Sequence, residues 1–121
     1  MSKEEGREDN RMNEPYFFFG DLREHAPLPP NGILSRTLHA DERSKIIQFC
    51  FAPGQELSAH TAPVPALLCF VQGEAELQLG GDVKTVREGA LAYMAPGLEH
   101  AIRAKSEVVM LLVMFREPAK S

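Results

Sequence analysis

The sequence predicts an all-β protein, and three observations lead to this fold class. Nine glycines and nine prolines are spread through 121 residues, a composition typical of many short elements separated by turns. From residue 33 onward, short apolar or alternating segments follow one another, each bounded by Gly, Pro or Asp. Between residues 33 and 115 we find no amphipathic helix of about ten residues or more. The spacing fits an antiparallel sandwich or barrel.

The strands are predicted from alternation and from apolar runs. In Glu74–Leu79, alanine and leucine alternate with polar residues, and Gly80 and Gly81 then offer a tight hairpin turn. The last segment, Val108–Phe115, is apolar on both faces, as expected of a strand covered on both sides. The predicted strands are Tyr16–Phe19, Ile33–Leu38, Lys45–Phe51, Leu57–Thr61, Ala66–Gln72, Glu74–Leu79, Val83–Arg87, Leu91–Ala95, His100–Ala104 and Val108–Phe115.

The chain is predicted to form one domain with short flanking segments. Residues 1–14 hold eight charged side chains and one large apolar residue, Met12, so we expect a disordered N-terminal tail. Residues 15–32 are interpreted as an N-terminal strand and a Pro-rich connector, residues 33–117 as the barrel, and residues 118–121 as a C-terminal tail.

Composition excludes several classes of function. The formal net charge is −4 and the basic residues are scattered, so we expect no nucleic-acid partner. The longest apolar run, Val108–Phe115, is far shorter than the roughly 20 residues of a membrane span, so we expect no membrane association. The start is charged and lacks an apolar stretch, so no secretory signal is expected. With only two cysteines, a disulfide scaffold is not expected, and we predict a cytoplasmic protein.

Two segments combine glycine, proline and histidine at distinctive spacings. In the first, Gly54 is followed by His60 and later by Gly73, with the local segment His-Thr-Ala-Pro at residues 60–63. In the second, Gly89 is followed by the Pro-Gly pair at residues 96–97 and then by His100. These segments resemble the two signature motifs of the cupin superfamily, and the resemblance covers roughly residues 33–116. It implies a small single-domain cupin: a jelly-roll barrel, also called a double-stranded β-helix.

The resemblance also implies a metal site, but with an incomplete ligand set. Cupins hold their metal through two histidines and a glutamate of the first motif and one histidine of the second. Here His60 and His100 match two of these positions, whereas Ala62 stands in place of the second histidine and Ala66 in place of the glutamate. Two imidazoles, with water or substrate completing the shell, could hold Zn, Ni, Mn or Fe. The alternative is a pair of polar side chains lining a metal-free cavity.

Other donors near His60 are difficult to identify from the sequence. Strand alternation places Glu56, Ser58 and His60 on one face, but Glu56 would lie about 13 Å from His60. Ser58 would lie about 6.6 Å away along the backbone, an awkward separation for a nucleophile–base hydrogen bond, and no partner acid is evident. The residue before His100, Glu99, is expected to point to the opposite face. Side chains that could approach from a neighbouring strand are Gln48, Glu76 and Gln78.

The remaining candidate residues are predicted to have structural roles. Met110, Leu112 and Met114 share one face of the last strand, where they pack in the core or line a ligand pocket. Cys50 and Cys69 are expected to be inert core thiols. The other histidines, His25 and His39, match neither motif and are expected in solvated loops.

Several functions fit this pattern. The first hypothesis is a small cupin that binds a small molecule, with a weakly held divalent metal at His60 and His100. The alternatives are a metal-free ligand-binding or sensing module, a metal-dependent dioxygenase or isomerase, and an accessory domain that acts through protein contacts. Whether the protein is an enzyme is left open. Because residues 46–51 and 108–115 are apolar on both faces, we also expect a homodimer.

Overall fold

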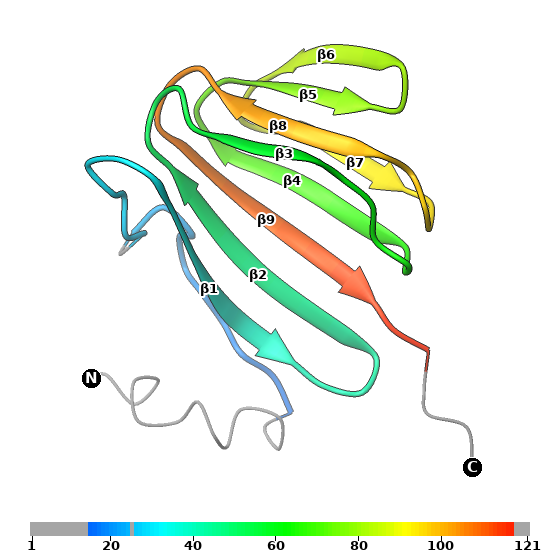
Figure 1. The fold of residues 1–121 in the computed structure, drawn as a ribbon. Coiled ribbons are helices and arrows are strands. Elements are labelled where there is room, and N and C mark those ends of the chain that lie inside the picture. Colours follow the sequence, from blue (N-terminus) through cyan, green and yellow to red (C-terminus); the bar gives the residue numbers. More distant parts are fainter. Residues whose placement is uncertain (1–14, 25, 118–121) are drawn as a thin grey trace.

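The computed structural model describes residues 15–24 and 26–117. Its strands are β1 (Ile33–Ala40), β2 (Ser44–Phe51), β3 (Glu56–His60), β4 (Ala66–Gln72), β5 (Ala75–Leu79), β6 (Asp82–Val86), β7 (Leu91–Met94), β8 (His100–Ala104) and β9 (Val108–Phe115). They form a five-stranded sheet, β1-β2-β9-β4-β7, and a four-stranded sheet, β3-β8-β5-β6 (Figure 1). Every pairing is antiparallel. The all-β jelly-roll barrel predicted from the sequence is confirmed.

The strands from residue 33 onward lie where the sequence predicts them. Each predicted segment corresponds to an observed strand, with ends that agree or differ by one or two residues. The β5–β6 hairpin pairs Leu79 with Asp82 across the turn at Gly80 and Gly81, and Gly80 has a φ of 61°.

The part of the chain that the structure describes contains no helix that could span a membrane. The predicted tails at residues 1–14 and 118–121, and His25, lie outside the described residues.

The predicted strand at residues 16–19 is wrong. This stretch has no strand hydrogen bonding, although its side chains do alternate: Tyr16 and Phe18 are each 78% exposed, whereas Phe17 and Phe19 are half-buried. Phe17 stacks on His39 of β1 with the ring centroids 5.3 Å apart. The segment is therefore attached to the sheet by side-chain packing rather than by a backbone ladder, and alternation alone does not distinguish the two.

His39 is also not the solvated loop residue that the sequence suggested. It lies in β1, half-buried, and its Nε2 is 2.8 Å from Asp41 Oδ2. Asp41 also accepts backbone hydrogen bonds from Arg43 and Ser44 in the β1–β2 turn. The hydrogen bond from His39 is the largest influence on Asp41, and with the two backbone bonds it holds the pKa of this carboxyl well below its usual range. His39 therefore stabilises the turn and packs against the N-terminal segment.

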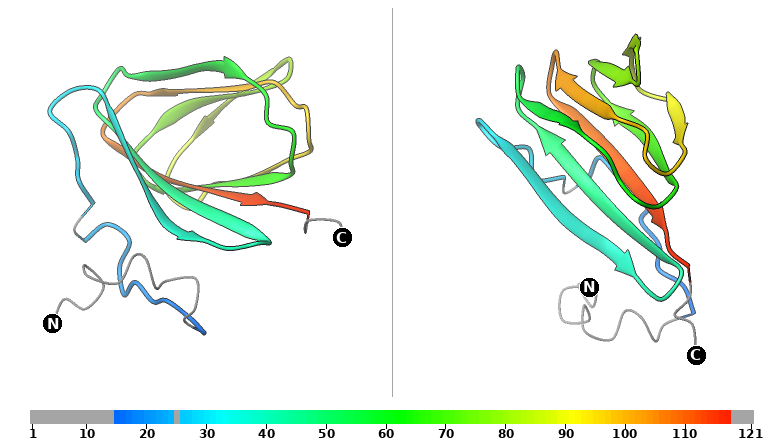
Figure 2. Two further views of the ribbon diagram at one scale, coloured as in Figure 1. Left: turned by 60° about the horizontal axis from the view of Figure 1, so that its bottom comes forward. Right: turned by 45° about the vertical axis from the view of Figure 1, so that its right-hand side comes forward.

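The core lies between the inner faces of the two sheets, which enclose the barrel interior (Figure 2). Inner residues alternate with outer ones along the strands. In β5, for example, Ala75 and Leu77 are buried while Glu76 points outward to Arg103. The buried apolar cluster consists of Phe51, Ala66, Leu68, Phe70, Ala75, Leu77, Met94, Ile102, Ala104, Val108 and Met110.

Gly73 sits at a close approach of two segments of backbone. It has a φ of 91°, and a Cβ atom placed on it would lie 1.9 Å from the carbonyl oxygen of Glu107. No side chain fits there without moving the loop between β8 and β9. Gly89 has a similar φ of 94°, but a Cβ atom on it would meet nothing within 4 Å. The two glycines therefore share a backbone conformation that strains any other residue, but only Gly73 lacks the space for a Cβ atom.

We predict that Gly73→Ala is much more damaging than Gly89→Ala. The positive φ alone costs about 1–2 kcal/mol in either variant, and the collision with the Glu107 carbonyl adds at least about 2 kcal/mol at Gly73. Urea unfolding of both variants measures the difference. Equal losses of the free energy of unfolding would contradict the close approach.

The outer face of the five-stranded sheet carries an apolar patch. The outward residues of β4 lie directly beside those of β7 and β9. Leu67, for example, is paired with Tyr93 on one side and with Val113 on the other. No charged side chain interrupts the patch, and its most exposed members are Leu91 at 67% and Tyr93 at 61%. We define the outer patch as Leu67, Cys69, Leu91, Tyr93, Leu111, Val113 and Phe115.

We predict that the chain forms a homodimer through the outer patch. An uncharged surface can meet its own copy across a two-fold axis without opposing like charges, and burying it removes exposed apolar area from water. Light scattering should give twice the monomer mass of 13.4 kDa. Tyr93→Glu should give a folded monomer by placing a charge inside the interface.

The control for this prediction is Val83→Glu. Val83 is 67% exposed on the other sheet, so it is similarly exposed but lies outside the outer patch. This variant should remain dimeric. A monomeric wild-type protein at micromolar concentration, or equal behaviour of the two variants, would contradict the prediction.

Candidate functional site

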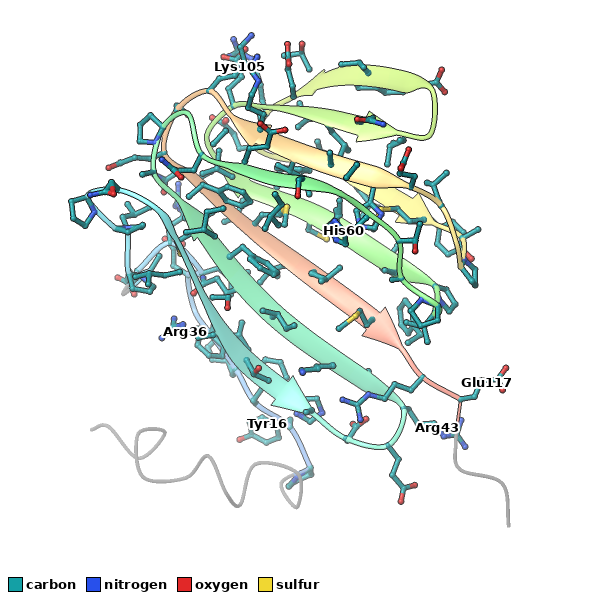
Figure 3. All side chains as sticks on the ribbon, in the orientation of Figure 1. Tyr16, Arg36, Arg43, His60, Lys105 and Glu117 are labelled. Atoms are coloured by element: carbon teal, nitrogen blue, oxygen red, sulfur yellow. The ribbon has the colours of Figure 1, made fainter. Side chains whose placement is uncertain are left out.

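The two histidines of the motifs lie side by side on neighbouring strands. His60 ends β3 and His100 begins β8, and the two residues are direct cross-strand partners. Their ring centroids are 4.3 Å apart, with the ring planes inclined at 56°. His100 is 5% exposed, whereas His60, labelled in Figure 3, is exposed. The pair therefore reaches from the barrel interior to solvent. Residues 40 positions apart in the sequence are thus brought together by the fold.

A β-bulge in β3 makes this pairing possible. Leu57 pairs with Ile102, so regular alternation would bring residue 59 opposite His100 and turn His60 to the outer face. The register instead shifts by one residue between Leu57 and His60. An extra residue in one strand re-aims the side chains that follow it. His60 therefore shares the inner face with Leu57 and His100.

The bulge corrects one prediction made from the sequence. Strand alternation placed Glu56, Ser58 and His60 on a single face, but the register shift separates His60 from the other two. Glu56 remains opposite Arg103, an outward residue, and contributes to a hollow on the outer face of the four-stranded sheet. Neither a shared carboxylate ligand nor a Ser58–His60 nucleophilic pair is consistent with this arrangement.

Both imidazole rings are held by backbone carbonyl groups. Nδ1 of His60 lies 2.7 Å from the carbonyl oxygen of Ser58, and Nδ1 of His100 lies 2.9 Å from that of Leu98. A carbonyl oxygen only accepts, so Nδ1 carries the proton and donates in each ring. The lone pair of each neutral ring is therefore on Nε2. This is the arrangement in which metal-binding histidines are commonly oriented by their surroundings.

The two positions that would complete the family's ligand set provide no donor side chain. Ala66 begins β4, is 1% exposed, and pairs with Met94 and Met114. Ala62 lies in the preceding loop, where its carbonyl oxygen accepts a hydrogen bond of 2.8 Å from the amide of Gly97. That bond joins the loop after His60 to the loop before His100. It helps to bring the two motifs together without contributing a ligand.

The other candidate donors face elsewhere. Gln48 is fully buried on the outer side of the five-stranded sheet, where it accepts from Arg36 and donates to the carbonyl of Leu22. Glu76 accepts from Arg103 at 2.9 Å on the outer face of the other sheet. Gln78 donates to the carbonyl oxygen of Gly80. Over residues 15–24 and 26–117, no group of three or more His, Cys, Asp or Glu side chains is placed to share a metal ion.

The distance between the two ring centroids can be compared with that of two imidazoles on one ion. With metal–nitrogen distances of about 2.1 Å, each ring centroid would lie about 3.2 Å from an ion bound through Nε2. The centroids would then be about 4.5 Å apart at a right angle and about 5.2 Å apart at a tetrahedral angle. The observed 4.3 Å is nearer to the right angle. Adjacent positions of an octahedral shell meet at right angles, and imidazole suits several first-row divalent metals.

The remaining predicted residues have structural positions. Met110 is 1% exposed in the core, and Leu112 and Met114 are half-buried against it. Cys50 is buried and Cys69 half-buried, and burial raises the pKa of both thiols. A raised pKa keeps a thiol protonated at neutral pH and therefore weakly nucleophilic. The raised pKa agrees with the prediction of inert thiols, but Cys69 lies in the outer patch and not in the core.

Sequence reasoning identified the two histidines but missed what orients them. The ring acceptors are the main-chain carbonyls of Ser58 and Leu98, two residues before each histidine. Every residue has a main-chain carbonyl, so the amino-acid types do not show which carbonyls accept a hydrogen bond from a ring. The bulge likewise depends on how β3 pairs with β8, which no local pattern in the chain encodes.

Comparison with known proteins identifies the family. A family model described as Cupin domain matches residues 47–115. The chain is similar to a protein of unknown function from Streptococcus pyogenes, at 30% identity and a TM-score of 0.77 over 88% of this chain and 94% of that one. It is also similar to a cupin superfamily protein from Desulfitobacterium hafniense, at 24% identity and a TM-score of 0.77 over 87% and 96% of the two chains.

A third solved structure, a Cupin 2 conserved barrel domain protein from Leptotrichia buccalis, is 28% identical with a TM-score of 0.72. The similarity covers 78% of this chain and 46% of that one. No match was found among curated proteins. The chain belongs to the cupin family and is a small cupin domain.

Proposed function

We propose that this cupin binds a small molecule in its barrel beside a weakly held divalent metal at His60 and His100. The observation that supports the proposal best is the orientation of the rings. Both Nδ1 atoms donate to carbonyl oxygens, so both Nε2 atoms keep their lone pairs, and the ring centroids are 4.3 Å apart. Two separate histidines that merely lined a cavity would not need the same tautomer.

The two histidines would hold the metal, and the fold around them would prepare the site. The carbonyls of Ser58 and Leu98 fix the ring orientations before any ion arrives. The exposure of His60 gives solvent or a ligand access to the remaining coordination positions. When bound, a divalent ion would supply Lewis-acid chemistry to a coordinated oxygen. A dioxygenase or an isomerase would be the enzymatic form of this proposal.

A metal-free binding or sensing module is the second candidate, and the alanines favour it. Ala62 and Ala66 remove two ligands that the family's metal site uses, so fewer protein groups would hold the ion. In such a module the Nε2 atoms of the two imidazoles would accept hydrogen bonds from the ligand itself. For the location we propose the cytoplasm, because the two cysteines are free thiols, as is usual in a reducing compartment.

We predict metal uptake that depends on both histidines of the pair. Elemental analysis after incubation with Mn, Fe(II), Ni or Zn and removal of free ions should find up to one ion per wild-type chain. His60→Ala and His100→Ala should each reduce this content by more than tenfold, because one imidazole is left to hold the ion. A modest chelator should remove the ion without unfolding the protein, unlike a four-ligand structural zinc.

The matched control is His39→Ala, which removes a half-buried histidine that is bonded to Asp41 and lies outside the pair. Its metal content should equal that of the wild type. If all four proteins contain the same amount of metal, or if none takes up any, the metal proposal is wrong and the metal-free module is the better account.

A further inference from the structure

A second site lies at the seam between the two sheets, where edge strands β6 and β7 face each other. A groove with a volume of about 180 Å³ opens there. Its walls come from β4, β5, β6 and β7 and from the loop before β7. The groove is lined by Phe70, Leu77, Leu79, Lys84, Val86, Ala90, Leu91, Ala92 and Tyr93, of which Leu91 and Tyr93 form its outer rim and also belong to the outer patch of the predicted dimer.

The floor of the groove is apolar and belongs to the barrel interior. Phe70 and Leu77 are almost fully buried, and Leu79, Val86 and Ala92 pack against the same core. An apolar cavity of about 150 Å³ is enough to bind a benzene ring. The groove therefore has room for one aromatic ring or a short branched hydrocarbon chain.

One lining residue carries a charge. Lys84 pairs with Leu77 across the hairpin, so it lies on the inner face of edge strand β6. It is exposed and forms no ion pair with any described residue, whereas Lys105 lies 3.8 Å from Glu74. A lysine in this position can also serve to block unwanted pairing of an edge strand. A ligand that uses both the floor and the ammonium group must combine an apolar body with a negative charge.

We propose that this groove binds small carboxylates with an apolar or aromatic body. The apolar part lies on the floor formed by Leu77, Leu79 and Ala92, and the carboxylate pairs with the ammonium group of Lys84. The groove reaches Leu79, the neighbour of the histidine pair, but its charged residue, Lys84, lies apart from that pair. His100 pairs with Leu79 on the neighbouring strand, whereas Lys84 lies on the strand beyond it. Binding in the groove therefore needs no metal.

The test is a benzoate titration of the metal-free full-length protein, followed by ¹H–¹⁵N correlation NMR. We expect saturable shifts centred on Leu77, Leu79 and Ala92, with a Kd of about 1–10 mM for so small a ligand. Benzamide has nearly the same shape without the charge and should bind about fivefold more weakly, as expected for the loss of one exposed ion pair.

Three variants make the test specific. Lys84→Gln should weaken benzoate binding about fivefold and leave benzamide binding unchanged. Lys105→Gln makes the same change outside the groove and should bind benzoate like the wild type. His60→Ala should also bind like the wild type, so failure of the metal proposal does not affect this result.

Two outcomes would overturn the proposal. The first is the absence of saturable shifts in the groove of the wild-type protein. The second is equal benzoate binding by Lys84→Gln and Lys105→Gln. In either case Lys84 acts only to protect the edge of the sheet.

A groove-filling variant, Ala92→Leu, should abolish binding of both benzoate and benzamide while the backbone spectrum shows a folded barrel.

Discussion

The candidate site depends on a single irregularity in one strand pairing. Leu57 and His60 both face the barrel interior, although they are three residues apart, because β3 has one more residue than β8 between their paired positions. Without this bulge, His60 would point away from His100 and a shared ligand would be impossible. The carbonyl oxygen that orients the His60 ring belongs to Ser58, one of the residues within the shift. The same local distortion therefore brings the ring inward and fixes its tautomer.

The rest of the barrel holds this irregularity in place. On one side, the amide of Gly97 donates to the carbonyl oxygen of Ala62, so the loop that follows His60 is tied to the loop that precedes His100. On the other side, the amide of Gly54 donates a hydrogen bond of 2.8 Å to the carbonyl oxygen of Ala104, which closes the far end of the β3–β8 pair. The bulge thus lies between two fixed ends. The amides of two motif glycines, Gly54 and Gly97, thus donate the hydrogen bonds that hold these ends.

The sequence predicted the architecture well because the signals for strands are local. Alternation in Glu74–Leu79 and the doubly apolar Val108–Phe115 reflect burial on one face or on both, and the structure confirms both strands. The errors occurred where pairing decides the outcome. Tyr16–Phe19 alternates like a strand but only packs on the sheet, and His60 follows the bulge rather than the alternation. Side-chain identity also gave no indication of main-chain acceptors or of the groove beside Lys84, which residues from four strands create together.

His60 and His100 face one another, and the carbonyl acceptors at both Nδ1 atoms require Nδ1 protonated and Nε2 free. Long-range ¹H–¹⁵N NMR of the metal-free protein, at a mildly alkaline pH where imidazoles are neutral, observes this directly because the two ring nitrogens differ strongly in chemical shift when one carries the proton. The structure predicts the Nδ1–H tautomer for both rings and a cross-relaxation contact between their carbon-bound protons. An Nε2–H tautomer at either residue, or the absence of any contact between the rings, would contradict the account.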